Sequence, residues 1–293
     1  MKTALFTSNL TGEYLLDALD ELGFYPQVYT YPAGFQKTAL SRDFGRYRGL
    51  FPMTFISSNK YGEAPEAVLD SDTVALCVDW TKDFFMGTDV KAVFAHPSLL
   101  PLYRGYSAVT EQFLRGVAVS GASFYIASDR VDGGDVLFSE EIRIGFGEYP
   151  EDFLRKYAAV CARFVKDFAE KGFGGFKAVP QDERESFYLP RKRRREGVID
   201  FNRDAYSIYN HIRGFSRPYF GAYFMRNGRQ ITVWRAAAEK WQGEYGRPGE
   251  LVELTPYGAE IACGSGTVLI EEAECEGRLF RRGEVHELYY AVD

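Results

Sequence analysis

The sequence predicts an α/β protein whose N-terminal part holds a mostly parallel sheet and whose C-terminal part is a small antiparallel β barrel. Two observations predict this division. Before residue 172, short apolar runs alternate with amphipathic stretches, an order typical of parallel strands joined by helices. After residue 220, five short alternating runs are separated by glycine-containing turns, which is typical of antiparallel strands.

Composition is that of an ordinary globular protein. The 293 residues exceed what one core usually organises, so we expect two domains. A net charge of -6 gives no general attraction for phosphate backbones, although a basic patch could be local. We find neither a signal peptide nor an apolar run of membrane-spanning length, so we expect a cytoplasmic protein without membrane contact. Four cysteines without CxxC spacing and three scattered histidines suggest neither a zinc site nor a disulfide framework.

The chain opens with a predicted strand, turn and helix. The strand is expected over 2–7 and the helix over 13–22, where leucines recur at helical spacing. The turn over 8–12 lacks GxGxxG, so a dinucleotide is not favoured. Ser8 and Asn9 could contact a sugar or phosphate of a substrate, or they could simply cap the helix; both interpretations stay open.

The spacing of apolar residues also predicts the later elements: short apolar or alternating runs indicate strands, and helical spacing indicates helices. Strands are expected over 28–31, 50–56, 73–78, 90–95, 121–127 and 136–144. Helices are expected over 63–69, 107–116 and 151–171. The five runs of the predicted barrel are 221–226, 230–235, 249–254, 259–263 and 268–273.

Two segments concentrate positive charge. The irregular loop 34–49 carries Lys37, Arg42, Arg46 and Arg48. It could be a solvated loop or a contact for the phosphate of a nucleotide-linked substrate. The basic run 191–195 suggests nucleic acid, but a solvated connector or a contact to a small phosphate-bearing molecule explains it as well. We place the boundary here, with domains over 1–190 and 191–293.

One stretch is typical of an active-site loop. His96 follows the apolar run 90–95 and opens the segment His-Pro-Ser-Leu-Leu-Pro-Leu-Tyr-Arg-Gly over 96–105. The prolines and the glycine exclude regular helix or strand there. Loops at the ends of buried strands are where α/β proteins bind ligands. A second glycine-rich turn, Asp-Gly-Gly-Asp over 132–135, follows later in the chain.

Together these segments resemble the folate-dependent formyltransferases, which act on methionyl-tRNA, glycinamide ribonucleotide or amino sugars. The likeness rests on His-Pro-Ser-Leu-Leu-Pro, the aromatic-Arg-Gly after it, and an Asp thirty-six residues after the His, here Asp132. It extends from about residue 73 to the C-terminus. Within this range, Gly-Val-Ile-Asp over 197–200 also matches. One position departs from the pattern, because the family's catalytic Asn falls at position 94 and this chain has Phe94.

The resemblance implies a Rossmann-like formyltransferase core followed by an OB-like antiparallel β barrel. It implies that 10-formyltetrahydrofolate donates a formyl group to a primary amine, with His96 and Asp132 catalytic and no metal. Folate contacts are implied at Val78, Trp80, Ser98, Leu100, Asp129 and Val131. Substrate contacts are implied at Ser8, Asn9, Tyr103, Arg104 and Gly105.

Several of these residues also have a structural explanation. Trp80 offers a flat face to a pterin ring, but tryptophans commonly belong to the core. Arg104 could bond loop carbonyls instead of facing substrate. Asn210 and Arg213 match family positions that help build a cleft between domains, and helix capping or salt bridging explains them equally well.

His96 and Asp132 suit formyl transfer. In this reaction an amine attacks a formyl carbonyl, an oxyanion develops and the amine loses a proton. An imidazole can accept that proton or, when protonated, stabilise the oxyanion, and a carboxylate can orient the ring and share the proton.

Phe94 lacks the amide donor of an Asn, which is typically worth about 10²–10³ in rate. Three explanations stay open: a slower enzyme that relies on His96 and a backbone amide, a donor such as Asn59 from elsewhere, or a protein that binds folate without efficient transfer.

We expect a nucleotide-linked amino sugar as the acceptor. Methionyl-tRNA is less favoured because the chain is acidic, and aminoacyl or siderophore amines remain alternatives. Exposed β edges in the barrel are compatible with a homodimer.

Overall fold

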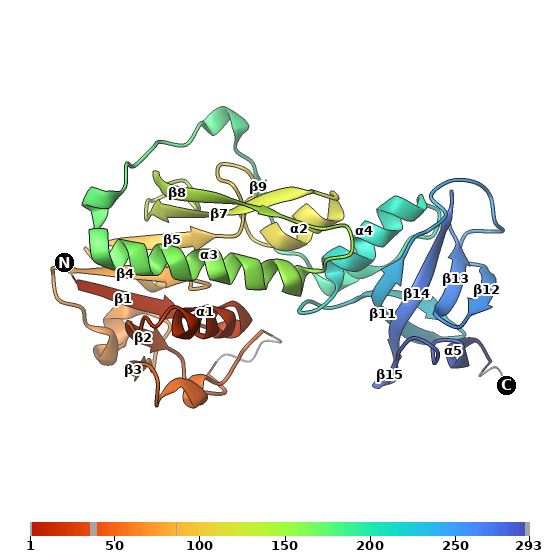
Figure 1. Cartoon of the computed structure of the whole chain (residues 1–293), viewed down its shortest axis with the longest axis horizontal. Helices are drawn as coiled ribbons and strands as arrows, with labels where there is room; N and C mark the ends of the chain where they lie inside the picture. The colour runs from red at the N-terminus through yellow and green to blue at the C-terminus, as the bar shows by residue number, and fades with distance from the viewer. Residues whose placement is uncertain (1, 36–39, 86, 291–293) are drawn as a thin grey trace. The chain divides into compact units, whose positions relative to one another are not determined.

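The computed structural model describes residues 2–35, 40–85 and 87–290 (Figure 1). The chain divides into two compact units. Unit 1 comprises Met1–Ala108, Val119–Ile144 and Asp152–Pro190. Unit 2 comprises Val109–Ala118, Gly145–Glu151 and Arg191–Asp293, so it includes two short segments from the first half of the sequence.

Unit 1 is built on a seven-stranded sheet in the order β3-β2-β1-β4-β5-β7-β8. Its strands are β1 (Lys2–Thr7), β2 (Gln27–Thr30), β3 (Met53–Phe55), β4 (Thr73–Val78), β5 (Ala92–His96), β7 (Val119–Ile126) and β8 (Val136–Arg143). The first five pair in parallel, whereas β7 and β8 run antiparallel. The predicted α/β class with a parallel-dominated sheet is confirmed.

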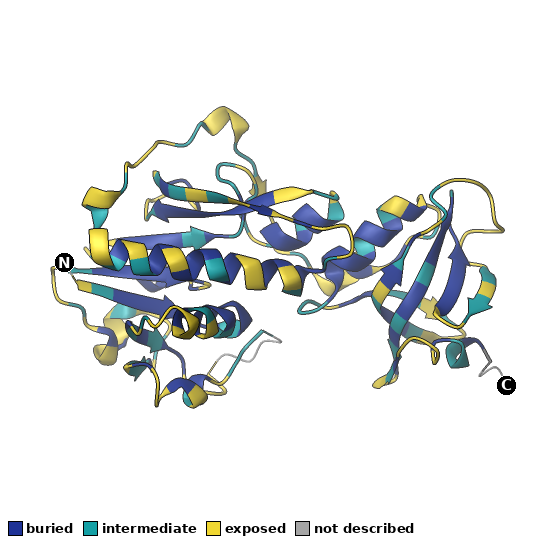
Figure 2. Cartoon of the chain, in the orientation of Figure 1, coloured by how far each residue is buried: buried dark blue, intermediate teal, exposed yellow. Residues whose placement is uncertain are grey.

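The α-helices in the first 171 residues are α1 (Asn9–Glu21), α2 (Ala108–Leu114) and α3 (Pro150–Lys171). Helix α3 buries Phe153, Tyr157, Phe164 and Phe168, which recur every three to four residues or multiples of that spacing. Figure 2 shows buried and exposed residues alternating along α3 accordingly. The prediction of a long amphipathic helix here is confirmed.

Four predicted boundaries need correction. Helix α1 begins at Asn9, earlier than residue 13, because Ser8 takes the extended backbone of an N-cap. The segment 63–69 forms two 3₁₀ turns, η2 (Tyr61–Glu63) and η3 (Pro65–Ala67), instead of an α-helix; Pro65 has no N–H to continue one. Strand β3 is shorter than 50–56, and β5 includes His96 as its last residue.

The remaining 3₁₀ turns are η1 (Phe44–Tyr47), η4 (Lys82–Phe85), η5 (Phe173–Gly175), η6 (Glu183–Glu185) and η7 (Arg194–Gly197).

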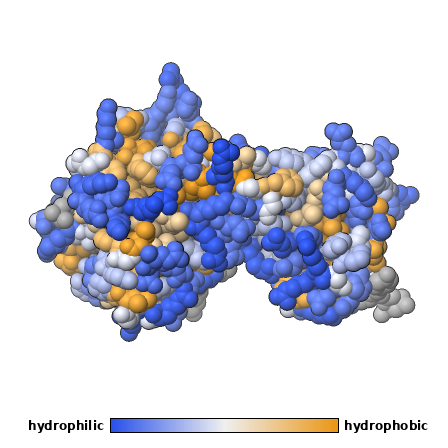
Figure 3. Space-filling model, in the orientation of Figure 1, coloured by the Kyte–Doolittle hydropathy of each residue, from blue (hydrophilic) through white to orange (hydrophobic). Residues whose placement is uncertain are grey.

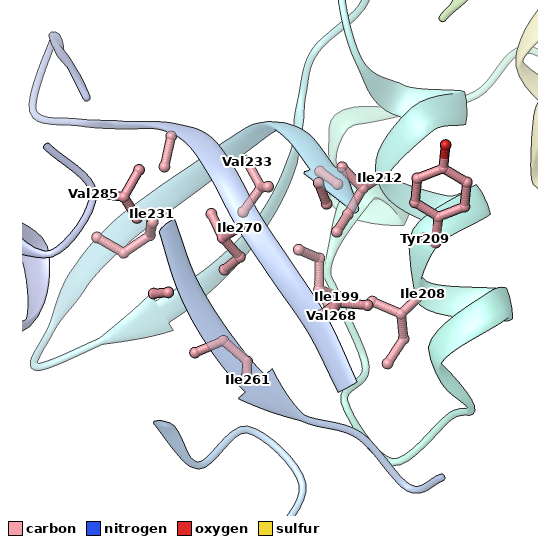
Figure 4. Close-up of a cluster of buried hydrophobic side chains, with 14 of the residues drawn as sticks. Ile199, Ile208, Tyr209, Ile212, Ile231, Val233, Ile261, Val268, Ile270 and Val285 are labelled. Carbon is pink, nitrogen blue, oxygen red and sulfur yellow. The ribbon is translucent and has the colours of Figure 1, made fainter. Parts of the chain in front are cut away.

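Unit 2 holds an antiparallel sheet in the order β10-β11-β14-β13-β12, with β15 paired to β14. The strands are β10 (Ala222–Arg226), β11 (Arg229–Ala237), β12 (Leu251–Thr255), β13 (Gly258–Ala262), β14 (Thr267–Cys275) and β15 (Arg278–Phe280). Helix α4 (Ala205–Phe215) packs on this sheet, and α5 (Glu287–Tyr290) follows β15. Figure 4 shows Ile208 and Ile212 of α4 beside Val233, Val268 and Ile270 in the core of the unit. The five predicted strands are confirmed.

A two-stranded parallel ladder joins the loop 96–105 to the segment before residue 190. It consists of β6 (Arg104–Gly105) and β9 (Tyr188–Leu189). None of the helices in the described ranges is both long and apolar enough to cross a bilayer.

Candidate functional site

His96 and Asp132 lie together although thirty-six residues separate them in sequence. His96 ends β5, and Asp132 lies in the turn between β7 and β8. The distance from imidazole Nδ1 to carboxylate Oδ1 is 3.5 Å. The two residues are only 5% and 4% exposed, so bulk water screens their interaction little. We call them the His96–Asp132 pair.

The other ring nitrogen fixes the tautomer of His96. Nε2 lies 2.8 Å from the backbone carbonyl oxygen of Tyr103. A carbonyl oxygen only accepts hydrogen bonds, so Nε2 carries the hydrogen. The neutral ring therefore presents the lone pair of Nδ1 toward Asp132. A proton arriving at Nδ1 would convert this contact into an ion pair.

Two donors hold the Asp132 carboxylate. The Tyr125 hydroxyl donates to Oδ1 at 2.7 Å, and the backbone N–H of Gly105 donates to Oδ2 at 2.6 Å. Both hydrogen bonds favour the ionised carboxylate. Burial and the negative charge of Asp132 raise the pKa of the Tyr125 phenol well above its usual range. Sequence analysis did not single out Tyr125, since an isolated Tyr in a strand carries no functional signal.

Two glycines allow the loops to meet at this point. Gly105 has φ 91° and packs against β9, where a Cβ would lie 2.7 Å from the carbonyl oxygen of Leu189. At Gly134 a Cβ would overlap the carbonyl oxygen of Ile126. The Gly-rich turn therefore folds tightly enough to return Asp132 to the sheet.

Arg104 is fully buried, and its guanidinium is held by protein side chains. It donates to Gln181 Oε1 at 2.8 and 3.0 Å and to the Glu183 carboxylate at 2.9 and 3.0 Å. Its Nη1 also donates to the Tyr188 hydroxyl. Gln181 in turn donates to the carbonyls of Asp132 and Gly134 at 2.8 and 2.6 Å. These contacts favour the structural explanation of Arg104, although its partners are side chains where loop carbonyls were expected.

Comparison with known families agrees with this arrangement. The formyl transferase family model matches residues 79–162, and the model of the formyl transferase C-terminal domain matches residues 192–280. The chain belongs to the formyl transferase family. The first match contains both His96 and Asp132.

The chain is similar to several relatives and solved structures. It is 31% identical over 185 residues to methionyl-tRNA formyltransferase of Geobacter sulfurreducens, covering 62% of this chain and 57% of that protein. It thus spans little more than half the length of that curated relative. A structure of HypX from Aquifex aeolicus in complex with tetrahydrofolic acid has a TM-score of 0.69 at 16% identity, over 99% of this chain and 48% of that chain.

A second structure matches along nearly its whole length. The N-formyltransferase from Helicobacter canadensis, in complex with folinic acid and dTDP-3-aminofucose, has a TM-score of 0.69 at 16% identity. The match covers 92% of this chain and 98% of that chain. At this identity the likeness establishes the shared fold.

The predicted folate residues differ widely in exposure. Val131, beside Asp132, is 50% exposed, which is unusual for a large apolar side chain, and Asp129 is also exposed. Leu100 is half-buried, and its N–H donates to the Ser123 hydroxyl at 3.0 Å. Ser98 is buried, with its hydroxyl donating to the Leu102 carbonyl at 2.6 Å.

Val78 and Trp80 belong to the core of unit 1. Val78 is fully buried, and Trp80 is 8% exposed. The indole stacks on Tyr31 at 4.4 Å between ring centroids and meets the ring of Phe84 at 5.4 Å. This packing accounts for Trp80 as a core residue in this conformation.

Ser8 and Asn9 lie at the carboxyl end of β1. Ser8 occupies the N-cap position of α1, but its hydroxyl donates to the Asp79 carbonyl at 3.0 Å instead of capping the helix. Asn9 Oδ1 is buried without a hydrogen-bond partner within the described ranges. Both residues line a cavity of about 10 Å³ together with Arg42, enough for one water molecule.

Asp79 was not predicted as a site residue. It follows β4, beside Ser8 and Asn9. Loss of hydration within the surrounding protein raises the pKa of its carboxyl to about 6, although hydrogen bonds from Thr11 and Asn9 lower this pKa. The raised pKa of Asp79 depends on the folded surroundings of its carboxyl, so the sequence alone gives no reason to select this residue.

The positively charged segments are partly neutralised within their own units. In unit 1, Arg42 pairs with Glu13 at 3.3 Å, and Arg46 pairs with Glu13 at 3.0 Å. In unit 2, Lys192 pairs with Glu111 at 3.0 Å. Lys37 lies outside the described residues. Arg48 packs over the ring of Phe55 at 4.2 Å.

Asn210 and Arg213 lie on α4 in unit 2. Arg213 is buried and donates to the carbonyls of Gly145, Phe146 and Glu148 at 2.7–3.1 Å. Its second terminal nitrogen donates to Asn210 Oδ1 at 2.9 Å. The two side chains therefore hold the segment Gly145–Glu151 onto α4.

Proposed function

We propose that this protein transfers a formyl group to the primary amine of a nucleotide-linked amino sugar, with His96 and Asp132 as catalytic residues. 10-Formyltetrahydrofolate supplies the formyl group. The observation that carries the proposal is the approach of His96 Nδ1 to Asp132 within 3.5 Å in a member of the formyl transferase family. We further propose a catalytic domain over 1–190, a C-terminal domain with an OB-like barrel over 191–293, a cytoplasmic location and a homodimer.

The His96–Asp132 pair handles the proton of the attacking amine. As the amine nitrogen bonds to the formyl carbon, its proton passes to Nδ1, either directly or through the carboxylate of Asp132. The resulting imidazolium opposes the negative charge that develops on the formyl oxygen. His96 then returns the proton to the folate nitrogen as its bond to the formyl carbon breaks. The hydrogen bond from Nε2 to Tyr103 keeps the ring oriented throughout.

Phe94 makes this protein slower than one with an amide donor at that position. Its side chain is buried and lies beside the ring of Tyr125, so it offers the formyl oxygen no hydrogen bond. We propose that His96 and a backbone amide supply the stabilisation. Asn59, the alternative donor, is exposed on the segment after β3.

Folate would bind beside the turn that carries Asp132. The exposed side chains of Val131 and Asp129 would make direct contact, together with Leu100. Val78, Trp80 and Ser98 are buried and would shape the pocket from behind. The similar structures of HypX with tetrahydrofolic acid and of the N-formyltransferase with folinic acid support folate as the ligand.

The amino group of the acceptor would approach through Tyr103 and Gly105. Tyr103 is partly exposed, and its ring lies 4.9 Å from that of Phe187. The more distant part of the acceptor would contact Ser8 and Asn9. Arg104 is buried and would position the loop.

Methionyl-tRNA is the second candidate acceptor. It is favoured by the curated relatives, which are methionyl-tRNA formyltransferases. The ion pairs of Arg42, Arg46 and Lys192 argue against it, because paired cations attract a polyanion less strongly. We therefore prefer the small-molecule acceptor.

A panel of acceptors tests the proposal. Purified protein is incubated with 10-formyltetrahydrofolate and nucleotide-linked amino sugars, methionyl-tRNA or no acceptor, and tetrahydrofolate release and product mass are followed. We expect a formylated sugar, and a rate about 10²–10⁴-fold lower in His96→Asn because the proton acceptor is lost. His286→Asn, in unit 2, serves as the matched control and should keep its activity.

Formylated methionyl-tRNA as the sole product would replace the preferred acceptor by the second candidate. Folate binding without turnover on any amine would contradict the enzymatic proposal and favour a catalytically degenerate folate-binding member of the family.

A further inference from the structure

The buried phenol of Tyr125 bonds to the same carboxylate oxygen that faces His96. Tyr125 lies on β7 and is 1% exposed. Its hydroxyl is 2.7 Å from Asp132 Oδ1, whereas Nδ1 of His96 is 3.5 Å from that oxygen. The phenol is therefore the closer partner of the oxygen through which the pair would exchange a proton.

The surroundings of Tyr125 fix its position. It stands directly opposite Phe94 in the β5–β7 ladder, and the two rings stack with centroids 6.1 Å apart. Burial is the largest cause that keeps the pKa of the phenol far above neutrality, followed by the charge of Asp132. The hydroxyl consequently stays protonated and acts as a donor to the carboxylate.

We propose that Tyr125 is a positioning residue whose hydroxyl keeps Asp132 ionised, so that the proton released by the amine resides on His96. This inference rests on the proposed function and adds a residue to it. The hydroxyl and the N–H of Gly105 each bind one carboxylate oxygen, so the carboxylate is held from both sides. Both donors stabilise its charge while the imidazole gains and loses the proton.

The direction of the effect on proton release follows from the groups that face Asp132. These are the imidazole of His96 from β5, the phenol of Tyr125 from β7 and the N–H of Gly105 from β6. The thiol of Cys77 on β4 lies near the phenol, and burial keeps it neutral by raising its pKa well above the usual range. Without the phenolic donor, the carboxylate presents more of its negative charge to the imidazole, so His96 should hold its proton to higher pH.

Tyr125→Phe tests this role because it removes only the hydroxyl. We expect kcat to fall about 10–100-fold, the effect of losing one hydrogen bond to a charged group. KM for the formyl donor should change little, and the acid limb of the pH–rate profile should move to higher pH. Tyr149→Phe removes another buried hydroxyl, in unit 2, which donates to the Ala236 carbonyl, and it should change neither kcat nor the pH profile.

A second measurement does not depend on turnover. The chain has three histidines, so the imidazole signals of His96 can be assigned in NMR spectra by comparison with His96→Asn. In Tyr125→Phe the titration midpoint of His96 should move to higher pH. If that variant fails to fold, 3-fluorotyrosine placed at position 125 keeps the ring and strengthens the donor, and it should move the midpoint to lower pH.

The two measurements separate the inference from the proposed function. A shifted midpoint with a shifted pH profile supports both. A shifted midpoint in a protein without turnover on any amine contradicts the proposed function while supporting the hydrogen-bonding role of Tyr125. An unchanged midpoint, or an equal loss of activity in Tyr149→Phe, overturns the inference.

Discussion

At the residue scale, the state of His96 follows from a single backbone carbonyl. Tyr103 accepts the hydrogen bond from Nε2, which leaves Nδ1 as the basic atom, and Nδ1 faces Asp132. Because both side chains are nearly buried, a charge on either is felt strongly by the other. The local chain path thus determines which nitrogen can take a proton.

Asp79 makes a testable contribution to the pH dependence of stability. The pKa of its carboxyl is raised to about 6 by the surrounding protein, so the folded state binds a proton more tightly than the unfolded state. Its contribution to the free energy of unfolding is therefore present at low pH and is lost as pH rises through about 6. Because more than a third of the residue is exposed, solvent screening should reduce the contribution of the raised pKa to the free energy of unfolding.

Asp79→Asn should consequently gain stability relative to the parent protein as pH rises from about 4 to 7, across the interval between the usual and raised pKa. Thermal unfolding of both proteins over this range measures the difference in Tm. Asn keeps an oxygen that accepts the hydrogen bonds from Thr11 and Asn9. A difference in Tm that stays constant with pH would contradict the assignment.

The sequence could indicate some site residues and not others. His96 and Asp132 could be selected as candidates because they belong to a long ordered pattern with a fixed spacing. Tyr125 and Gln181 carry no such pattern, and their roles depend on contacts with Asp132 that only the folded chain creates. Trp80 had two explanations in sequence, and its stacking on Tyr31 favours the structural one.

At the element scale, the segment from Gln181 to Leu189 supports the loop 96–105 within unit 1. Its sequence is charge-dense and is followed by Pro190, which is typical of a solvated linker. In the structure, β9 pairs with β6, while Gln181 and Glu183 satisfy the buried guanidinium of Arg104. A polar residue that completes a buried hydrogen-bond network cannot be distinguished from a solvated one by composition.

Helix ends were the least predictable features. The helical spacing of apolar residues in α3 repeats over many turns and identified this helix well. The short segment 63–69 is too short for that spacing to repeat. Pro65 is tolerated in the first turn of a helix, so its presence alone did not exclude one. The side chains on this segment pack adequately with 3₁₀ turns, as the full burial of Ala64 and Ala67 indicates.

The contact between α4 and the segment Gly145–Glu151 gives a prediction at this scale. Arg213→Met leaves several carbonyls of that segment without their buried donor, so we expect a loss of about 3 kcal/mol in the free energy of unfolding. Denaturant unfolding measures it. Arg203→Met, at an exposed position just before α4, should change stability by less than about 0.5 kcal/mol. Equal losses in the two variants would show that Arg213 does not anchor the segment.

At the scale of the whole molecule, the class of each unit could be predicted but the order of the strands could not. Alternation of apolar runs with amphipathic stretches indicated a parallel sheet, and short alternating runs indicated an antiparallel one. The antiparallel pair β7 and β8 at one edge of the larger sheet has no distinct periodicity. Nor does the sequence reveal that Val109–Ala118 and Gly145–Glu151 group with the C-terminal residues, since this depends on contacts distant along the chain.

The surface is compatible with a small polar acceptor. Figure 3 shows apolar patches among mainly hydrophilic residues on the face it presents. The net charge of -6 and the paired cations of both units provide no general attraction for a polyanion. We therefore propose that particular contacts near the His96–Asp132 pair recognise the acceptor.

A double-mutant cycle on that pair tests the account most directly. The rate of formyl transfer to the best acceptor is measured for the parent protein, His96→Asn, Asp132→Asn and the double variant. If the two residues act as one proton-transfer unit, each single variant loses about 10²–10⁴ in rate, and the double variant is no slower than the slower single one. Losses that multiply in the double variant, or a single variant that keeps the parent rate, would contradict a joint role.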